Sequence, residues 1–146
     1  MPNKVSRRKF LEQAALAGAA ATRALDAIST EIHGIPTRVL GRTREKVTIL
    51  ALGCGSRLLS YEKEEAAVAA LQLALDLGIR YIDTAYGYGN GRSETWVGQV
   101  MNTRRKGVFL GTKINSRQGQ EAERILEGSL KRLQTDQVDL IHVHSL

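Results

Sequence analysis

Four short apolar stretches recur along the chain at nearly constant spacing, and this regularity constrains the fold more than any other feature. The last residues of the four stretches are Gly53, Asp83, Lys113 and His144, so that successive ends lie 30, 30 and 31 residues apart. One strand followed by one helix takes about 30 residues. We therefore predict an α/β fold in which parallel strands alternate with helices, either as a doubly wound sheet or as a (β/α) barrel.

The segments around these strand ends have the patterns expected of such a fold. The run at 49–53 is continuously apolar, which predicts a strand buried on both faces. Ser60 is expected to cap a helix that ends at Gly78, and Ser93 a second helix with Glu94 in its first turn. The other predicted elements are a β-hairpin formed by 37–40 and 46–49, strands at 79–83, 107–113 and 137–144, and a helix near 119–133.

Composition narrows the class of protein. Hydrophobic residues make up 42% and charged residues 25%, as in ordinary globular domains. No apolar stretch reaches the length of about 18 residues that a transmembrane helix needs. The net charge of +6 divides into +3 in residues 1–22 and +3 in the remainder, which has no basic stripe, so no nucleic-acid partner is predicted. Cys54 is the only cysteine, which excludes an internal disulfide and a cysteine-based zinc site, and we expect it in the core.

The first 30 residues have the organisation of a targeting signal. A basic start leads into an Ala-rich stretch at 13–22 that is too short to span a bilayer. The string SRRKFL at 6–11 resembles the twin-arginine motif, which directs export of folded proteins. We therefore expect residues 1–30 to be a twin-arginine-type signal and linker, and the protein to be periplasmic. The alternative is an amphipathic surface helix of a cytoplasmic protein.

Three of the four strand ends carry a side chain that can take part in acid–base chemistry, namely Asp83, Lys113 and His144, and Tyr88 follows Asp83 by five residues. Each could have a structural role taken alone. In a parallel β/α layout, however, the carboxyl ends of all strands face one rim, which is where such folds carry out chemistry. A lysine at the end of an apolar strand also needs a partner, because a buried lone ammonium is costly. We therefore predict one shared site.

The motifs that carry these residues resemble the aldo/keto reductase family. They are YIDTAYGYGNGRSE at 81–94, GTK at 111–113 and DLIHVH at 139–144, preceded by RVLGRT and KVTILALG. The resemblance covers residues 37–146. It implies the hairpin and first four strands of a (β/α)8 TIM barrel, NADP(H) as hydride carrier, and aldehydes or ketones as substrates.

The resemblance also implies a catalytic tetrad formed by Asp83, Tyr88, Lys113 and His144. Tyr88 would donate a proton to the carbonyl oxygen, and the ammonium of Lys113 would stabilise the phenolate that remains. Asp83 would keep Lys113 charged, and His144 would orient the substrate oxygen. The resemblance places the main cofactor contacts beyond Leu146, so no cofactor-binding residue is predicted here.

Length leaves a second interpretation open. A complete barrel takes roughly 250 residues, and 37–146 supplies 110 of them. We expect the chain to be a fragment of a longer reductase or to pair with another half barrel, by self-association or with a partner. A half barrel that binds a ligand without turnover, or an incompetent remnant, is the non-enzymatic alternative.

A third interpretation rests on the H-x-H pattern of His142 and His144. Two histidines two apart on a strand point the same way and can share a metal ion. This pattern would suit a metal-dependent TIM-barrel hydrolase. Such a site would need further ligands at neighbouring strand ends, and Lys113 is a poor neighbour for a cation. We therefore predict no metal site.

Overall fold

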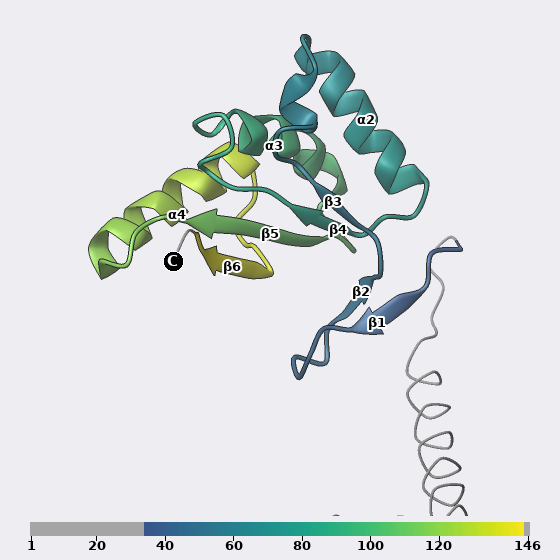
Figure 1. Ribbon diagram of the computed structural model, residues 1–146, viewed down its shortest axis with the longest axis horizontal. Helices are drawn as coiled ribbons and strands as arrows, with labels where there is room; N and C mark the ends of the chain where they lie inside the picture. Colours follow the sequence, from purple (N-terminus) through teal and green to yellow (C-terminus); the bar gives the residue numbers. More distant parts are fainter. Residues whose placement is uncertain (1–33, 145–146) are drawn as a thin grey trace, which may run out of the picture.

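The computed structural model describes residues 34–144, so the predicted signal at 1–30 lies outside the described residues. A two-stranded hairpin precedes a four-stranded sheet, a short 3-10 helix and three α-helices (Figure 1). The strands are β1 (Thr37–Val39), β2 (Lys46–Thr48), β3 (Ala51–Gly53), β4 (Tyr81–Asp83), β5 (Phe109–Ile114) and β6 (Leu140–Val143). The helices are η1 (Leu58–Ser60), α2 (Glu64–Asp76), α3 (Arg92–Arg104) and α4 (Gly119–Leu133). None of the helices between residues 34 and 144 has the length and apolar character that crossing a membrane requires.

The four strands of the sheet are parallel and stand in chain order, β3-β4-β5-β6. Helices α2, α3 and α4 all lie on one face of the sheet (Figure 1), and neighbouring helices pack on each other. A doubly wound sheet would carry helices on both faces. The arrangement is therefore part of a (β/α)8 barrel, with the helices outside and the opposite face of the sheet toward the barrel interior.

The hairpin confirms the prediction from the sequence. β1 and β2 pair antiparallel, with Thr37 opposite Thr48, and the turn includes Gly41 and Arg44 at positive φ. The Thr48 hydroxyl accepts a hydrogen bond from the backbone N–H of Arg80 at 3.1 Å. This bond fixes the hairpin to the chain entering β4, at the end of the sheet opposite the strand carboxyl ends.

The core lies between the sheet and the helices. Helix α2 contributes Leu71 and Leu75, and it ends beside Gly78, whose φ of +94° is readily adopted by glycine. The other apolar residues of this cluster that are at most 1% exposed are Cys54, Ala67, Ile82, Val97, Val100, Met101, Leu110 and Leu133.

The prediction that the first strand is buried on both faces is wrong. In β3, Ala51 and Gly53 are exposed, and the adjacent Ile49 and Leu50 are 50% and 55% exposed. The reason is that β3 pairs only with β4 among the described residues, so it forms an edge of the sheet. β6 forms the opposite edge in the same way.

The two predicted serine caps are also wrong. The residues that precede α2 and α3 are Lys63 and Gly91, and neither makes a capping side-chain hydrogen bond. Ser60 lies at the end of η1, and its hydroxyl donates to a carbonyl within that turn. Ser93 lies inside the first turn of α3, where its buried hydroxyl bonds to Cys54 and Thr84 instead of capping the helix.

Candidate active site

Asp83 and Lys113 form an ion pair at the carboxyl ends of β4 and β5. The ammonium Nζ of Lys113 lies 2.5 Å from Oδ2 of Asp83 and donates a second hydrogen bond of 2.9 Å to the carbonyl oxygen of Thr84. The two side chains are only 11% and 25% exposed. A sparsely solvated ammonium is retained only when it is paired and hydrogen-bonded, so the pair has a fixed geometry.

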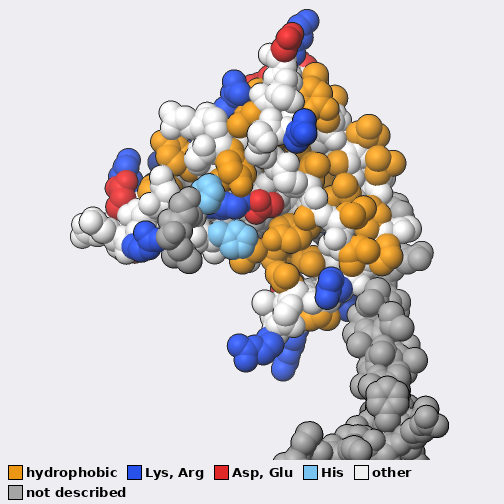
Figure 2. Space-filling view, viewed as in Figure 1, with side chains coloured by type: hydrophobic (Ala, Val, Ile, Leu, Met, Phe, Trp, Pro, Cys, Tyr) orange, Lys and Arg blue, Asp and Glu red, His pale blue; other side chains and the backbone are white. Residues whose placement is uncertain are grey.

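Tyr88 and His144 complete a cluster with this pair. The ring centroid of Tyr88 lies 4.8 Å from Nζ of Lys113, and the rings of Tyr88 and His144 meet edge to face with centroids 5.7 Å apart. The structure therefore brings all four side chains of the predicted site together at the carboxyl ends of β4, β5 and β6, and we call this part of the surface the mouth. Figure 2 shows histidine side chains beside basic and acidic groups on the open face of the molecule.

The loop that carries Tyr88 is held by hydrogen bonds at both ends. The N–H of Tyr88 donates to the carbonyl of Ala85 at 3.1 Å, and the carbonyl of Tyr88 accepts the N–H of Ser93 at 3.2 Å. The buried hydroxyl of Ser93 donates to the carbonyl of Cys54 at 2.6 Å and lies 2.8 Å from the hydroxyl of Thr84. Ser93 thus joins the ends of β3 and β4 to the start of α3, which fixes the base of the loop.

The other histidine of the H-x-H pattern, His142, lies beside the same cluster and is more exposed than His144. His142 stands opposite Lys113 in the β5–β6 register, and its Nδ1 is 3.8 Å from Oδ1 of Asp83. Between residues 34 and 144 there is no group of three or more His, Cys, Asp or Glu side chains placed to hold a metal ion. Nothing in this part of the chain favours the alternative of a metal-dependent hydrolase.

Comparison with known proteins agrees with this geometry. Residues 51–146 match the model of the aldo/keto reductase family. The chain belongs to the aldo/keto reductase family. It is 36% identical over 102 residues to methylglyoxal reductase YeaE of Escherichia coli (strain K12), a match covering 67% of this chain and 36% of that protein.

Solved aldo/keto reductases show the same fold. The holo form of aldo-keto reductase AKR11C1 from Bacillus halodurans is 32% identical, with a TM-score of 0.65 over 73% of this chain and 39% of that one. An aldo-keto reductase from Klebsiella pneumoniae in complex with NADPH is 32% identical, with a TM-score of 0.62 over 69% and 36% of the two chains. The chain thus spans little more than a third of the length of the curated relatives it matches.

Cys54 belongs to the core of this aldo/keto reductase fold, as predicted. It is fully buried, and its thiol donates weakly to the carbonyl of Leu52. Burial, together with the negative charge of Asp83, raises the pKa of the Cys54 thiol to about 12, whereas Lys113 lowers it. A thiol that stays protonated at neutral pH is a poor nucleophile.

Sequence reasoning missed a second buried charge beside the site. The sequence pattern predicts for Glu94 only a place in the first turn of a helix, but its side chain is fully buried and accepts hydrogen bonds from the hydroxyl of Thr112 and from Arg132. A signal was available, because Glu94 stands three and seven residues before Val97 and Met101 on the apolar stripe of α3. A carboxylate on such a stripe needs buried partners.

Proposed function

We propose that this protein, as part of a complete barrel, reduces aldehydes or ketones to alcohols with NADPH. The observation that carries the proposal is the position of the Tyr88 ring, which lies 4.8 Å from the Lys113 ammonium that Asp83 holds. The family supports the reaction type, and solved structures of relatives in complex with NADPH or NADP support the cofactor. The substrate class is the one that membership of this family implies, and a relative named methylglyoxal reductase supports it.

The side chains in the mouth are suited to transfer a proton to the carbonyl oxygen. Carbonyl reduction adds a hydride to carbon and a proton to oxygen, and bound NADPH supplies the hydride. The hydroxyl of Tyr88 donates the proton, and the ammonium of Lys113 stabilises the phenolate that is left. Asp83 keeps Lys113 charged and in place. His144 donates a hydrogen bond to the substrate oxygen and so orients the carbonyl.

The residues that the structure describes offer space for the nicotinamide of NADPH but no motif that would bind its phosphates. The mouth is open above the ion pair, since Asp83 is 25% and His142 45% exposed. The glycine-rich segments at 53–56 and 87–91 do not complete a dinucleotide-binding motif. We therefore place the phosphate contacts of NADPH outside residues 34–144, in the rest of the barrel.

Cofactor titration and turnover test this proposal together. The full-length protein should quench or shift NADPH fluorescence on binding and should consume NADPH, followed at 340 nm, with a panel of aldehydes and ketones. The same panel with NADH reports cofactor preference. NADPH binding without consumption by any carbonyl would favour a binding role, and absence of NADPH binding would contradict the proposal.

We further propose that residues 37–146 form half of the barrel and need the other half. Both edge strands, β3 and β6, lack a second neighbour among the described residues, and Ile141 and Val143 of β6 are 40% and 46% exposed. Unpaired strand edges with exposed apolar groups promote pairing or aggregation. Purified residues 31–146 should therefore self-associate in sedimentation experiments. A stable, well-folded monomer would contradict this proposal.

The proposed location is the periplasm, through a twin-arginine-type signal at 1–30. The support is the basic start, the paired arginines and the Ala-rich stretch of the sequence. Residues 1–30 fused to a reporter that folds in the cytoplasm should export it, and the double change of Arg7 and Arg8 to Lys should block export. Export that is insensitive to this change would contradict the twin-arginine assignment.

A further inference from the structure

A buried carboxylate on α3 links the strand of Lys113 to the loop of Tyr88. Glu94 is 0% exposed, and its two oxygens have different partners. Oε1 accepts a hydrogen bond of 2.6 Å from the hydroxyl of Thr112, and Oε2 accepts one of 2.7 Å from Nε of Arg132. A buried carboxylate with both oxygens engaged is held in one place.

The first of these bonds fixes the strand that carries the lysine. Thr112 precedes Lys113 in β5, and neighbouring residues of a strand point to opposite faces of the sheet. The Thr112 hydroxyl therefore meets Glu94 on the helix side, while the Lys113 ammonium meets Asp83 on the interior side. Glu94 thus anchors the strand from outside at the residue next to the lysine.

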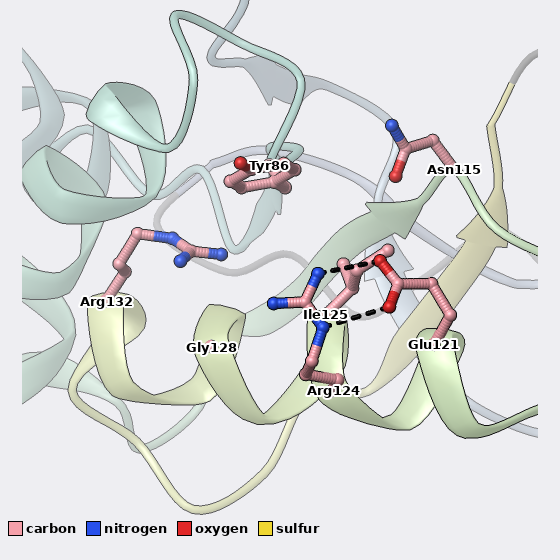
Figure 3. Close-up of a pocket in the computed structure, with 7 residues that line it drawn as sticks. All are labelled: Tyr86, Asn115, Glu121, Arg124, Ile125, Gly128 and Arg132. Carbon is pink, nitrogen blue, oxygen red and sulfur yellow. Dashed lines mark hydrogen bonds and ion pairs between the residues drawn. The ribbon is translucent and has the colours of Figure 1, made fainter.

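The second bond leads to the loop of Tyr88. The guanidinium of Arg132 pairs with Glu94 and also lies 4.7 Å from the ring centroid of Tyr86, two residues before Tyr88. Figure 3 shows this guanidinium extending from α4 toward the Tyr86 ring. Both side chains line a cavity of about 250 Å³. A guanidinium over an aromatic face attracts it electrostatically.

The backbone of the same loop is packed against Arg132 as well. The N–H of Gly91 donates to the carbonyl of Tyr86 at 2.7 Å, which closes the loop around Tyr88. A Cβ at Gly91 would come within 2.7 Å of Cδ of Arg132, and φ at Gly91 is +88°. The Arg132 side chain is therefore in close contact with both ends of the loop, and Glu94 holds it there.

We propose that Glu94 is a positioning residue that sets the place of Tyr88 relative to Lys113, acting through Thr112 on one side and through Arg132 and Tyr86 on the other. This inference rests on the proposed function, in which the spacing of the two groups governs proton transfer. Glu94 touches neither of them. Replacing Glu94 changes the position of Tyr88, although all four side chains of the tetrad are still present.

The test compares Glu94→Gln with Glu127→Gln, a control at an exposed glutamate of α4. In full-length protein labelled with ¹³C on tyrosine rings, the Tyr88 resonances are those lost in Tyr88→Phe. Glu94→Gln should shift these resonances and lower kcat at least tenfold, with KM changed less than threefold. Glu127→Gln should change neither. A folded Glu94→Gln protein with wild-type Tyr88 resonances and wild-type kcat overturns the proposal.

A second pair of variants decides the matter if Glu94→Gln does not fold. Tyr86→Leu removes the ring beside Arg132 without disturbing the buried charge, and Tyr86→Phe keeps the ring. Tyr88 resonances should shift more in Tyr86→Leu than in Tyr86→Phe, and kcat should follow the same order. Equal behaviour of the two overturns the proposal. The resonances can be measured without turnover. If the wild-type protein consumes no NADPH but the variants still shift the Tyr88 resonances, the proposed function is refuted and the positioning role stands.

Discussion

Gly98 of α3 lies directly against the backbone of Arg132 in α4, because a Cβ built on Gly98 would stand 2.1 Å from the carbonyl oxygen of Arg132. The two helices pack on each other at this point. The same contact places Glu94, one turn earlier on α3, within reach of the Arg132 guanidinium. The missing side chain of Gly98 is thus a condition for the buried ion pair.

Gly98→Ala should therefore be strongly destabilising. The new methyl group meets backbone atoms that cannot rotate away, so α3 and α4 must separate, at a cost of about 1–3 kcal/mol in the free energy of unfolding. Gly119→Ala is the matched control, since nothing lies within 4 Å of a Cβ there. It should be neutral or slightly stabilising. Urea unfolding followed by far-UV circular dichroism compares the two, and equal stability would contradict the close helix contact.

Tyr88→Phe should abolish carbonyl reduction while leaving the fold intact. The change removes only the hydroxyl and keeps the ring beside Lys113 and His144. Within residues 34–144, the loop is held by backbone hydrogen bonds that do not involve this hydroxyl. Loss of a proton donor lowers turnover by about 10²- to 10⁴-fold. NADPH consumption at 340 nm measures the loss. Tyr61→Phe, at an exposed tyrosine, is the control. Normal turnover by Tyr88→Phe would refute the role of this residue.

Asp83 and Lys113 should show strong coupling in a double-mutant cycle. Asp83→Asn leaves a sparsely exposed ammonium without its counter-charge, and Lys113→Met leaves the carboxylate alone, so each should cost about 1–3 kcal/mol in unfolding free energy. The double variant should be more stable than the sum of the two changes predicts, by about 1 kcal/mol.

The control for this cycle is the pair of Asp76 and Arg104, whose side chains are 61% and 34% exposed. Asp76→Asn should change the unfolding free energy by less than about 0.5 kcal/mol, because solvent screens such pairs. Simple additivity of the Asp83 and Lys113 changes would show that the two groups do not interact in solution.

The order of elements and the place of the site were predictable from the sequence because both depend on local patterns. A constant spacing of strand ends dictates parallel strands, and parallel strands bring Asp83, Lys113 and His144 to one rim. The structure confirms the parallel sheet and brings these groups together with Tyr88. Their chemical roles stay a prediction, since no contact within the chain reports on catalysis.

Features that depend on distant partners could not be predicted in the same way. The run at 49–53 is apolar enough for a fully buried strand, but its burial is set by which strands flank it, and β3 is an edge among the described residues. Ser93 has the residue type of a cap, but its hydroxyl bonds instead to Cys54 and Thr84, the residues that follow β3 and β4. Such competition is decided by tertiary contacts.

Cys54 should resist thiol reagents in the folded protein. Its side chain is fully buried, and burial raises the pKa of the thiol from 9.0 to about 12, so that almost no thiolate exists at pH 8. Above pH 9 the unfolded chain loses the Cys54 proton while the folded protein keeps it, because the folded-state pKa is raised. The free energy of unfolding is therefore unaffected by this thiol below pH 9 and falls as pH rises toward about 12. Reaction with a chromogenic disulfide at pH 8 should be slow in buffer and fast in denaturing urea, and Cys54→Ala supplies the background in both. Rapid labelling of Cys54 in the folded protein would show that the ends of β3 and β4 open readily, and the site above them could not then be rigid.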